Sequence, residues 1–302
     1  MLKLTHYLWY PLLLANAVLL FVALRASNAT LVPATYAPIL LTGLALAALE
    51  RARPARRAWR PPTIELKRDL LYMLLVQVLL PRALMLATVM LLARGGVGLG
   101  DAGPWPRHWP YVTQVLTLLV VADFLRYWLH RASHRWAPLW RLHEAHHAPD
   151  RLYALNVGRF HPLEKILQFG VDSLPFVLLG ATPEVIAGYY LLYAVNGQCQ
   201  HANVRLRYGW MNYLVGSAET HRWHHVRDEA CGPCNFGATL IVWDLLFGTF
   251  HLPRRQPRAV GIVDSSYPPG FVMQLLRPFL ATMTQGATGA ALLKLSLRAV
   301  FY

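Results

Sequence analysis

The chain has 302 residues, of which 55% are hydrophobic and only 15% are charged, whereas about 25% of the residues of an ordinary soluble domain are charged. This composition predicts a membrane protein and argues against a water-soluble globular domain. The formal net charge is +14, but the arginines follow the apolar stretches and form no solvated basic patch, so we expect no nucleic-acid partner.

Four apolar stretches are long enough to cross a bilayer as helices, because a crossing needs about 20 residues. They comprise residues 6–24, about 32–49, 69–93 and 110–129. The first stretch has no clear cleavage site after it, so we expect it to remain as a helix and not to be removed as a signal peptide.

The loops between these stretches differ in charge. Residues 50–68 form the basic loop, with Arg51, Arg53, Arg56, Arg57, Arg60, Lys67 and Arg68. The loop 94–109 carries only Arg94 and Arg107. Because cytoplasmic loops are enriched in Lys and Arg, we expect the basic loop to be cytoplasmic and the chain to return to the cytoplasmic side near His130.

A broken apolar run follows at residues 167–199. Its parts are about 13–16 residues long, shorter than a full span, which favours a shallow re-entrant helical pair. Pro175, Gly180 and Pro183 mark its bend. The fold class that we predict is all-α: a polytopic membrane protein with about four transmembrane helices, this re-entrant pair, and a cytoplasmic histidine-rich helical cap.

Three compact histidine motifs lie at and beyond the fourth stretch. They are His130 and His134, then His143, His146 and His147, and finally His221, His224 and His225. Positions i, i+3 and i+4 share one face of a helix, so we expect the members of each motif to point toward one spot. Two isolated histidines, His161 and His201, lie between the second and third motifs.

Eight imidazoles in three motifs exceed the three or four ligands of one zinc site, so two metal ions fit better. Imidazole suits iron, copper, nickel and zinc, and the scarcity of carboxylates argues against manganese, magnesium and calcium. Two iron ions beside a lipid-filled cavity could activate dioxygen to attack an unactivated C–H bond, chemistry that no amino-acid side chain provides.

Two other functions use some of the same residues. The segment HEAHH, residues 143–147, fits the zinc-protease pattern, with His143 and His147 as ligands and Glu144 as general base. A histidine-rich metal transporter is the other alternative. It should place its ligands at mid-membrane depth, whereas these histidines fall at or beyond helix ends.

From about residue 113 to 251, the order of the three motifs resembles the fatty acid hydroxylase and sterol desaturase superfamily of integral membrane enzymes. HPLE at 161–164 and NFGATLIVWDLLFGT at 235–249 are similar to further segments of that family. The resemblance implies a non-haem di-iron centre that uses dioxygen to hydroxylate or desaturate a fatty acyl, sterol-like or related lipid. Of the two reactions we favour hydroxylation.

Carried over to this sequence, the resemblance implies a set of histidine ligands. The set that we predict is His130, His134, His143, His146, His147, His161, His201, His221, His224 and His225. His6, His108 and His251 match no motif. No haem-binding or flavin-binding segment accompanies the motifs, so we expect a separate electron-donor protein to supply the electrons.

Carboxylates are expected to orient the ligand rings. The acids considered are Asp123, Glu144, Glu219, Asp228 and Asp244, of which Asp228 is interpreted as a surface acid. Asp123 lies within a span and is expected to pair with Arg126 or a histidine.

Three regions of the chain are distinguished. We expect N-terminal transmembrane helices and the basic loop at 1–109, a catalytic domain at 110–251, and a tail at 252–302 with an amphipathic or packing helix at 289–302. Cys231 and Cys234 form CGPC, but they lack the strand and helix of a redox site.

Overall fold

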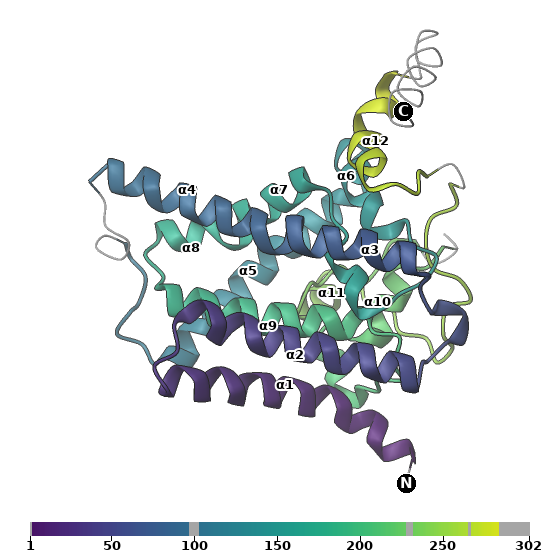
Figure 1. The fold of residues 1–302 in the computed structure, drawn as a ribbon, viewed down its shortest axis with the longest axis horizontal. Coiled ribbons are helices and arrows are strands. Elements are labelled where there is room, and N and C mark those ends of the chain that lie inside the picture. The colour runs from purple at the N-terminus through teal and green to yellow at the C-terminus, as the bar shows by residue number, and fades with distance from the viewer. Residues whose placement is uncertain (1, 97–102, 228–231, 265–266, 284–302) are drawn as a thin grey trace.

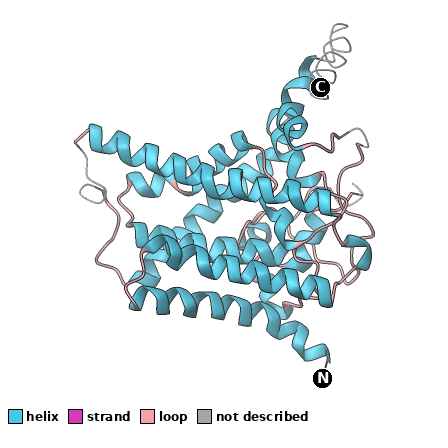
Figure 2. Ribbon diagram, in the orientation of Figure 1, coloured by secondary structure: helices cyan, strands magenta, loops and turns pink. Residues whose placement is uncertain are grey.

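The computed structural model describes residues 2–96, 103–227, 232–264 and 267–283, and their regular structure is helical (Figure 2). No β-strand occurs among these residues, only three isolated bridges such as that between Val215 and Leu240. The all-α prediction is therefore confirmed.

Four long helical segments form the body of the molecule (Figure 1). They are α1 (Leu2–Ala26), α2 (Leu31–Ala52), the continuous segment α3 (Thr63–Leu71), η2 (Tyr72–Leu79) and α4 (Leu80–Arg94), and α5 (Tyr111–Ser133). Within them, Leu4–Ala26, Leu31–Ala52, Thr63–Arg94 and Tyr111–Ser133 are long and apolar enough to cross a membrane. This agrees with the four stretches predicted from the sequence.

These segments differ in how far the rest of the protein encloses them. Only 17% of the most apolar window of the first and third spans is buried, against 44% of that of the fourth. Leu19 on α1 and Leu40 on α2 are 69% and 62% exposed. Large exposed apolar surfaces mark contact with another apolar phase, so α1, α2 and α4 present a lipid-facing surface while α5 is more enclosed.

The third span is interrupted by η2, which is a π-helix of eight residues. Such segments are rare and often occur at functional sites. Here Met73 and Gln77 of η2 line the cavity described below, and Gln77 Nε2 donates to the carbonyl of Gly158 at 3.4 Å. The apolar pattern of 69–93 predicted the helix and contained no sign of the π-segment.

The run 167–199 forms α7 (Pro162–Asp172), α8 (Leu174–Leu178) and α9 (Pro183–His201). Gly180, with a φ of 88°, lies at the predicted bend between α8 and α9. The helix α9 has 19 residues, of which 13 are buried, and lies along α2 (Figure 1). At 1.5 Å per residue α9 is about 28 Å long, so it is longer than the short re-entrant arm that the sequence predicted.

The elements that carry the histidine motifs gather at one end of the bundle, on the right in Figure 1. They are α6 (Ala137–His147), α10 (Ala218–His224), and the ends of α5 and α9, with η4 (Gly209–Tyr213) and α11 (Val242–Leu246) as neighbours. Ser217 caps α10, because its hydroxyl accepts from the backbone N–H groups of Glu219 and Thr220 at 3.2 and 3.0 Å.

Asn235 connects the segment after α10 to that helix by hydrogen bonds. Its φ is 56°, in the left-handed region that asparagine tolerates. Its Nδ2 donates to the carbonyls of Thr220 and His251 at 2.9 and 2.7 Å.

The sequence did not predict α12 (Phe271–Met283), which packs near α6. The helix predicted at 289–302 lies outside the described residues.

A buried ion pair joins the third span to the loop that precedes α7. Asp69 on α3 is fully buried and accepts from Nε of Arg159 at 2.8 Å, and the hydroxyl of Tyr153 also donates to it. The short helix η3 (Ala154–Gly158) lies between these two partners. The interaction therefore fixes η3 against the span.

Replacement of Asp69 tests this connection. In Asp69→Ala the Arg159 guanidinium loses its buried carboxylate, so we expect a loss of about 3–5 kcal/mol of stability. Unfolding in detergent, followed by circular dichroism, measures the loss. Glu65→Ala is the control, because the Glu65 carboxylate is 20% exposed and lies 3.6 Å from Arg151, and we expect it to cost about 1 kcal/mol or less. Equal losses would contradict a structural role for Asp69.

Candidate metal centre

Nine of the ten predicted ligands lie in two groups of facing imidazoles. The five-histidine group comprises His130, His134, His143, His147 and His224. The four-histidine group comprises His146, His201, His221 and His225. Within each group, the potential ligand atoms all lie within 4.8 Å of one another.

The two groups share the H-x-x-H-H motifs in the same way. On α6, His143 and His147 belong to the five-histidine group while His146 belongs to the four-histidine group. The third motif is divided likewise: His221 and His225 belong to the four-histidine group and His224 belongs to the five-histidine group. Adjacent helix positions differ in direction by about 100°, so i+3 and i+4 face different centres. The expectation that each motif points toward one spot is confirmed for His130 and His134, which share the five-histidine group, and is wrong for the two H-x-x-H-H motifs.

The two groups lie directly beside each other. The rings of His147 and His225, one from each group, stack with their centroids 4.3 Å apart. The rings of His143 and His146 are 5.4 Å apart. The shared motifs thus bring two potential metal positions together in one centre.

The ring nitrogens face one another at distances suited to a metal. His143 Nε2 lies 3.1 Å from Nε2 of both His130 and His147. His221 Nε2 lies 2.9 Å from that of His201 and 3.1 Å from that of His225. Two nitrogens that bind one ion at about 2.0–2.1 Å lie about 3 Å apart. The spacing therefore fits an ion at the centre of each group.

Hydrogen bonds on the far side of the rings fix their orientation. Nδ1 of His130 donates to the carbonyl of Phe236 at 2.7 Å, and Nδ1 of His224 donates to that of Cys234 at 2.8 Å. Because a carbonyl only accepts, each Nδ1 carries the proton and leaves the Nε2 lone pair free to bind a metal. Nε2 of His224 has no hydrogen-bond partner among the described residues.

Two polar side chains orient further ligands. Glu164 Oε1 lies 2.7 Å from Nδ1 of His143, and Asn156 Oδ1 lies 2.8 Å from Nδ1 of His201. Such outer partners set the tautomer of a metal-binding histidine and raise its basicity. The sequence offered a weak signal for Glu164, which ends the segment HPLE, and none for Asn156.

Burial keeps the imidazoles neutral. It lowers the pKa of His221 and His225 well below the usual value, and the neighbouring imidazoles lower it further. Burial also lowers the pKa of His224, to about 3. Neutral imidazole is the form that binds metal, so the residues present fit a two-metal centre bound through nitrogen.

His161 lies outside both groups. Its Nδ1 accepts from the backbone N–H of Leu163 at 3.1 Å, which caps the first turn of α7. Its Nε2 lies 3.0 Å from the carbonyl of Leu275 on α12. Both nitrogens are therefore used by the backbone, and we do not retain His161 among the ligands.

The acids that were expected to orient the rings serve other groups. Asp123 accepts from the backbone N–H groups of Thr239 and Leu240 at 2.6 and 3.1 Å. Arg126 pairs with Asp172 instead, so the expected pairing of Asp123 with Arg126 or a histidine is wrong. Asp244 accepts from the backbone of Phe236 at 2.7 Å.

The remaining acids also bond elsewhere. Glu219 accepts from the backbone N–H of Tyr208 at 2.9 Å and from Arg207 at 3.1 Å. Glu144 lies 3.9 Å from Nε of Arg277 on α12. Asp228 and Cys231 lie outside the described residues.

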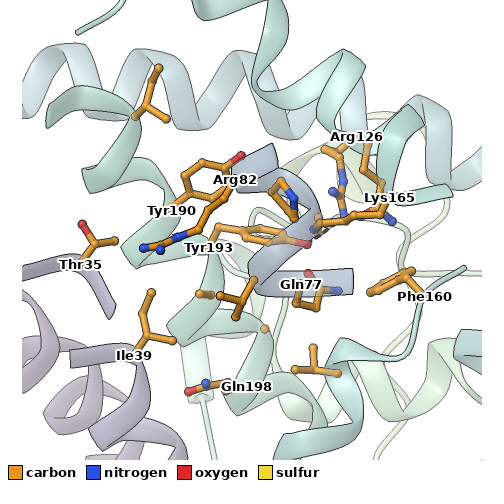
Figure 3. Close-up of a pocket in the computed structure, with 18 of the residues that line it drawn as sticks. Thr35, Ile39, Gln77, Arg82, Arg126, Phe160, Lys165, Tyr190, Tyr193 and Gln198 are labelled. Carbon is orange, nitrogen blue, oxygen red and sulfur yellow. Dashed lines mark hydrogen bonds between the residues drawn. The ribbon is translucent and has the colours of Figure 1, made fainter. Parts of the chain in front are cut away.

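A cavity of about 450 Å³ reaches the histidines from between the spans. Its lining includes Ile39 of α2, Met85 of α4, and His143 and His146 of α6. Figure 3 shows Arg126 and Lys165 together on one side of it, with Thr35 and Ile39 on the other. Binding sites of about 300–1,000 Å³ hold small molecules, so this cavity can bring an amphiphilic molecule to the metal centre.

Comparison with known proteins agrees with this geometry. Residues 115–249 match the family model described as fatty acid hydroxylase. Over 278 residues the chain is 32% identical to ornithine lipid hydroxylase OlsE of Rhizobium tropici, which covers 90% of this chain and 83% of that protein. The chain belongs to the fatty acid hydroxylase family.

Other relatives match a smaller part of this chain. Alkylglycerol monooxygenase of Homo sapiens is 28% identical over 147 residues, which are 49% of this chain and 32% of that protein. Very-long-chain aldehyde decarbonylase GL1-8 of Oryza sativa subsp. japonica is 32% identical over 157 residues, or 51% of this chain and 58% of the relative. No solved structure matches the chain.

Replacement of His201 distinguishes a ligand from a capping histidine. We expect His201→Ala to lose the metal of the four-histidine group while the five-histidine group keeps its own. His161→Ala, the matched control, should keep both metal ions, because the hydrogen bonds of the His161 ring are to backbone atoms. Elemental analysis of the purified proteins measures the metal content. Metal loss in His161→Ala and none in His201→Ala would reverse the assignment.

Removal of the Glu164 carboxylate tests its effect on His143. We expect Glu164→Ala to weaken metal binding by about 10–100-fold, as for other outer partners of metal-binding histidines. Glu164→Gln keeps an acceptor oxygen and should lose less. Competition with a chelator measures the affinity. Glu144→Ala is the control, and a loss as large as that of Glu164→Ala would show that position 164 has no particular role.

Proposed function

We propose that this protein is a membrane-bound, oxygen-dependent oxidoreductase that hydroxylates a lipid at a di-iron centre held by the nine grouped histidines. The observation that carries the proposal is the cavity, which joins these histidines to the space between α2, η2 and α4. The match to the fatty acid hydroxylase model and to a lipid hydroxylase supports the same reaction. We carry over from the relatives the hydroxylation of a lipid, without their particular substrates.

Two iron ions bound here would supply the activation of dioxygen, which side chains cannot perform. The overall reaction consumes one C–H bond, dioxygen, two electrons and two protons, and forms an alcohol and water. The electrons must come from a separate donor protein. A site whose ligands are all imidazoles suits iron, and it also suits copper, nickel and zinc.

The protein's own residues position the reactants and limit water. The carbonyls of Phe236 and Cys234 hold the rings of His130 and His224 in place. Val157 and Phe160 line the cavity, with the Phe160 ring stacked on that of His146, and their side chains offer water no hydrogen bond. An apolar lining near the metals favours a lipid chain over water. These contacts provide the orientation on which selective attack at one carbon depends.

The basic loop supports a cytoplasmic position for the histidine groups. The backbone N–H of Arg56 donates to Asn203 Oδ1 at 2.9 Å, two residues beyond His201. The basic loop and the histidines therefore lie at the same end of the bundle. Because Lys and Arg are enriched on the cytoplasmic side, we place this end in the cytoplasm, where the electron donor would bind. Residues 110–251 form the catalytic domain in this proposal.

Neither alternative function is supported by the geometry. A zinc protease would need Glu144 beside the metal that His143 and His147 bind. Glu144 lies instead toward Arg277 on α12 and belongs to neither histidine group. A transporter would need ligands at mid-membrane depth, and the ligands of this centre come from the ends of α5 and α9 and from α6 and α10.

Metal content and oxygen incorporation test the proposal together. We expect anaerobically purified protein to contain two iron ions per chain, one for each histidine group. With an electron donor and extracted membrane lipids, it should transfer one atom of isotopically labelled dioxygen into a lipid hydroxyl, detected by mass spectrometry. His225→Ala is the control and should lose metal and activity while keeping its helical circular dichroism. A single zinc ion that survives in His225→Ala would refute the di-iron centre.

A further inference from the structure

Lys165 is a buried cation on the wall of the cavity. Only 4% of the residue is exposed, and it lines the cavity together with His143 and His146. Its Nζ donates to Gln168 Oε1 in a long contact of 3.4 Å and lies 5.6 Å from the centre of the Tyr193 ring. No carboxylate of the described residues forms an ion pair with it.

The neighbouring charged side chains contact other groups, although Oε2 of Glu164 has no hydrogen-bond partner among the described residues. Arg126, on the same side of the cavity in Figure 3, pairs with Asp172 at 2.9 Å and donates to the hydroxyl of Tyr193 at 3.0 Å. Glu164 accepts from Nδ1 of His143 at 2.7 Å and from Gln168 at 3.1 Å. Lys165 is therefore the cation of this wall whose charge is left without a carboxylate.

A buried ammonium group without a counter-charge is unfavourable, and a partner that arrives with a ligand removes the penalty. We propose that Lys165 binds the anionic group, a carboxylate or a phosphate, of the lipid substrate. This inference rests on the proposed function, because it concerns the substrate of the same site. It places the anionic group at the metal end of the cavity and the apolar remainder toward α2 and α4.

The position of Lys165 determines which part of a bound lipid lies near the histidines. Figure 3 shows Lys165 on the same side of the cavity as Phe160, whose ring stacks on that of His146 with the centroids 4.2 Å apart, so the bound anion lies in the part of the cavity that the histidines also line. The opposite side carries Ile39 (Figure 3), and Met85 and Val89 of α4 also line the cavity. The carbon that reacts is therefore near the polar end of the lipid, and the end of its acyl chain points away from the metals.

Arg82 provides a matched comparison. It is a second cation in the cavity lining, but it is exposed and its guanidinium lies 4.3 Å from the centre of the Tyr36 ring. Figure 3 shows it beside Tyr190, away from Lys165. A substrate anion held by Arg82 would place the polar end of the lipid far from the histidines, the reverse of the arrangement proposed here.

Binding of matched lipids tests the proposal without turnover. Oleate and oleyl phosphate are compared with oleyl alcohol, which has the same chain and no charge, at a pH where both anions are ionised. Anaerobic, metal-loaded wild-type protein in neutral detergent should bind at least one anion about tenfold or more tightly than the alcohol, since hydrogen bonds to charged groups are the stronger kind. The two anions distinguish a carboxylate from a phosphate ligand. Native mass spectrometry measures the three affinities.

The variants locate the anion. Lys165→Met keeps most of the length of the side chain without its charge, and we expect it to lose the preference while binding oleyl alcohol as wild type does. Lys165→Arg should restore the preference, and Arg82→Met should keep it. Loss of the preference in Arg82→Met alone, or equal affinities for all three lipids in the wild type, would overturn the proposal. The wild-type comparison decides even if Lys165→Met does not fold.

Metal analysis of the same samples separates this inference from the proposed function. Protein that lacks iron yet prefers the anions through Lys165 would contradict the di-iron hydroxylase and leave the anion site standing. Protein that contains two iron ions and hydroxylates lipid without this preference would retain the function and refute the role of Lys165.

Discussion

The structure depends on the convergence of nine imidazoles at one end of a helical bundle. Each group collects rings from separate elements: α5, α6 and α10 for one, and α6, α9 and α10 for the other. Buried neutral rings with facing nitrogen lone pairs repel one another unless a cation lies between them. The spans, the caps and the segment 235–251 all act to keep the rings of each group within reach of one another.

The shared motifs couple the two groups. His146 and His147 are neighbours on α6 yet belong to different groups, as do His224 and His225. A small rotation of α6 or α10 would therefore disturb both groups at once. The cap at Ser217 and the bonds of Asn235 to α10 limit such a rotation. This explains why a short helix of seven residues, which would not be stable alone, can hold His221 and His224 in place, with His225 at its C-cap.

The sequence predicted the spans and most of the grouped histidines because both have local signals. Hydropathy gives the length of a crossing, and the spacing of histidines gives a shared helix face. What it missed depends on contacts between distant segments. Glu164 orients His143 only because α7 packs beside α6, and His161 is excluded because Leu275 of α12 occupies its Nε2. The division of the two H-x-x-H-H motifs between the groups could have been predicted from helix geometry, but which histidine faces which group depends on how the other helices pack. The π-helix η2 has no signal in the apolar pattern.

The chemistry of the ligands also bears on what the cavity accepts. Carboxylate-bridged di-iron bundles use glutamates that neutralise the charge of the metal ions, whereas the grouped ligands here are all imidazoles and Glu164 acts through His143. Bound cations are often the largest local charges of a site, so a metal-loaded centre of this composition makes the adjoining end of the cavity strongly positive. Lys165 adds to that charge, since Asp172 pairs with Arg126 and the carboxylate of Glu164 contacts His143. An anionic group is the complement that this end lacks, which makes entry of the lipid with its polar end toward the metals the arrangement that electrostatics favours.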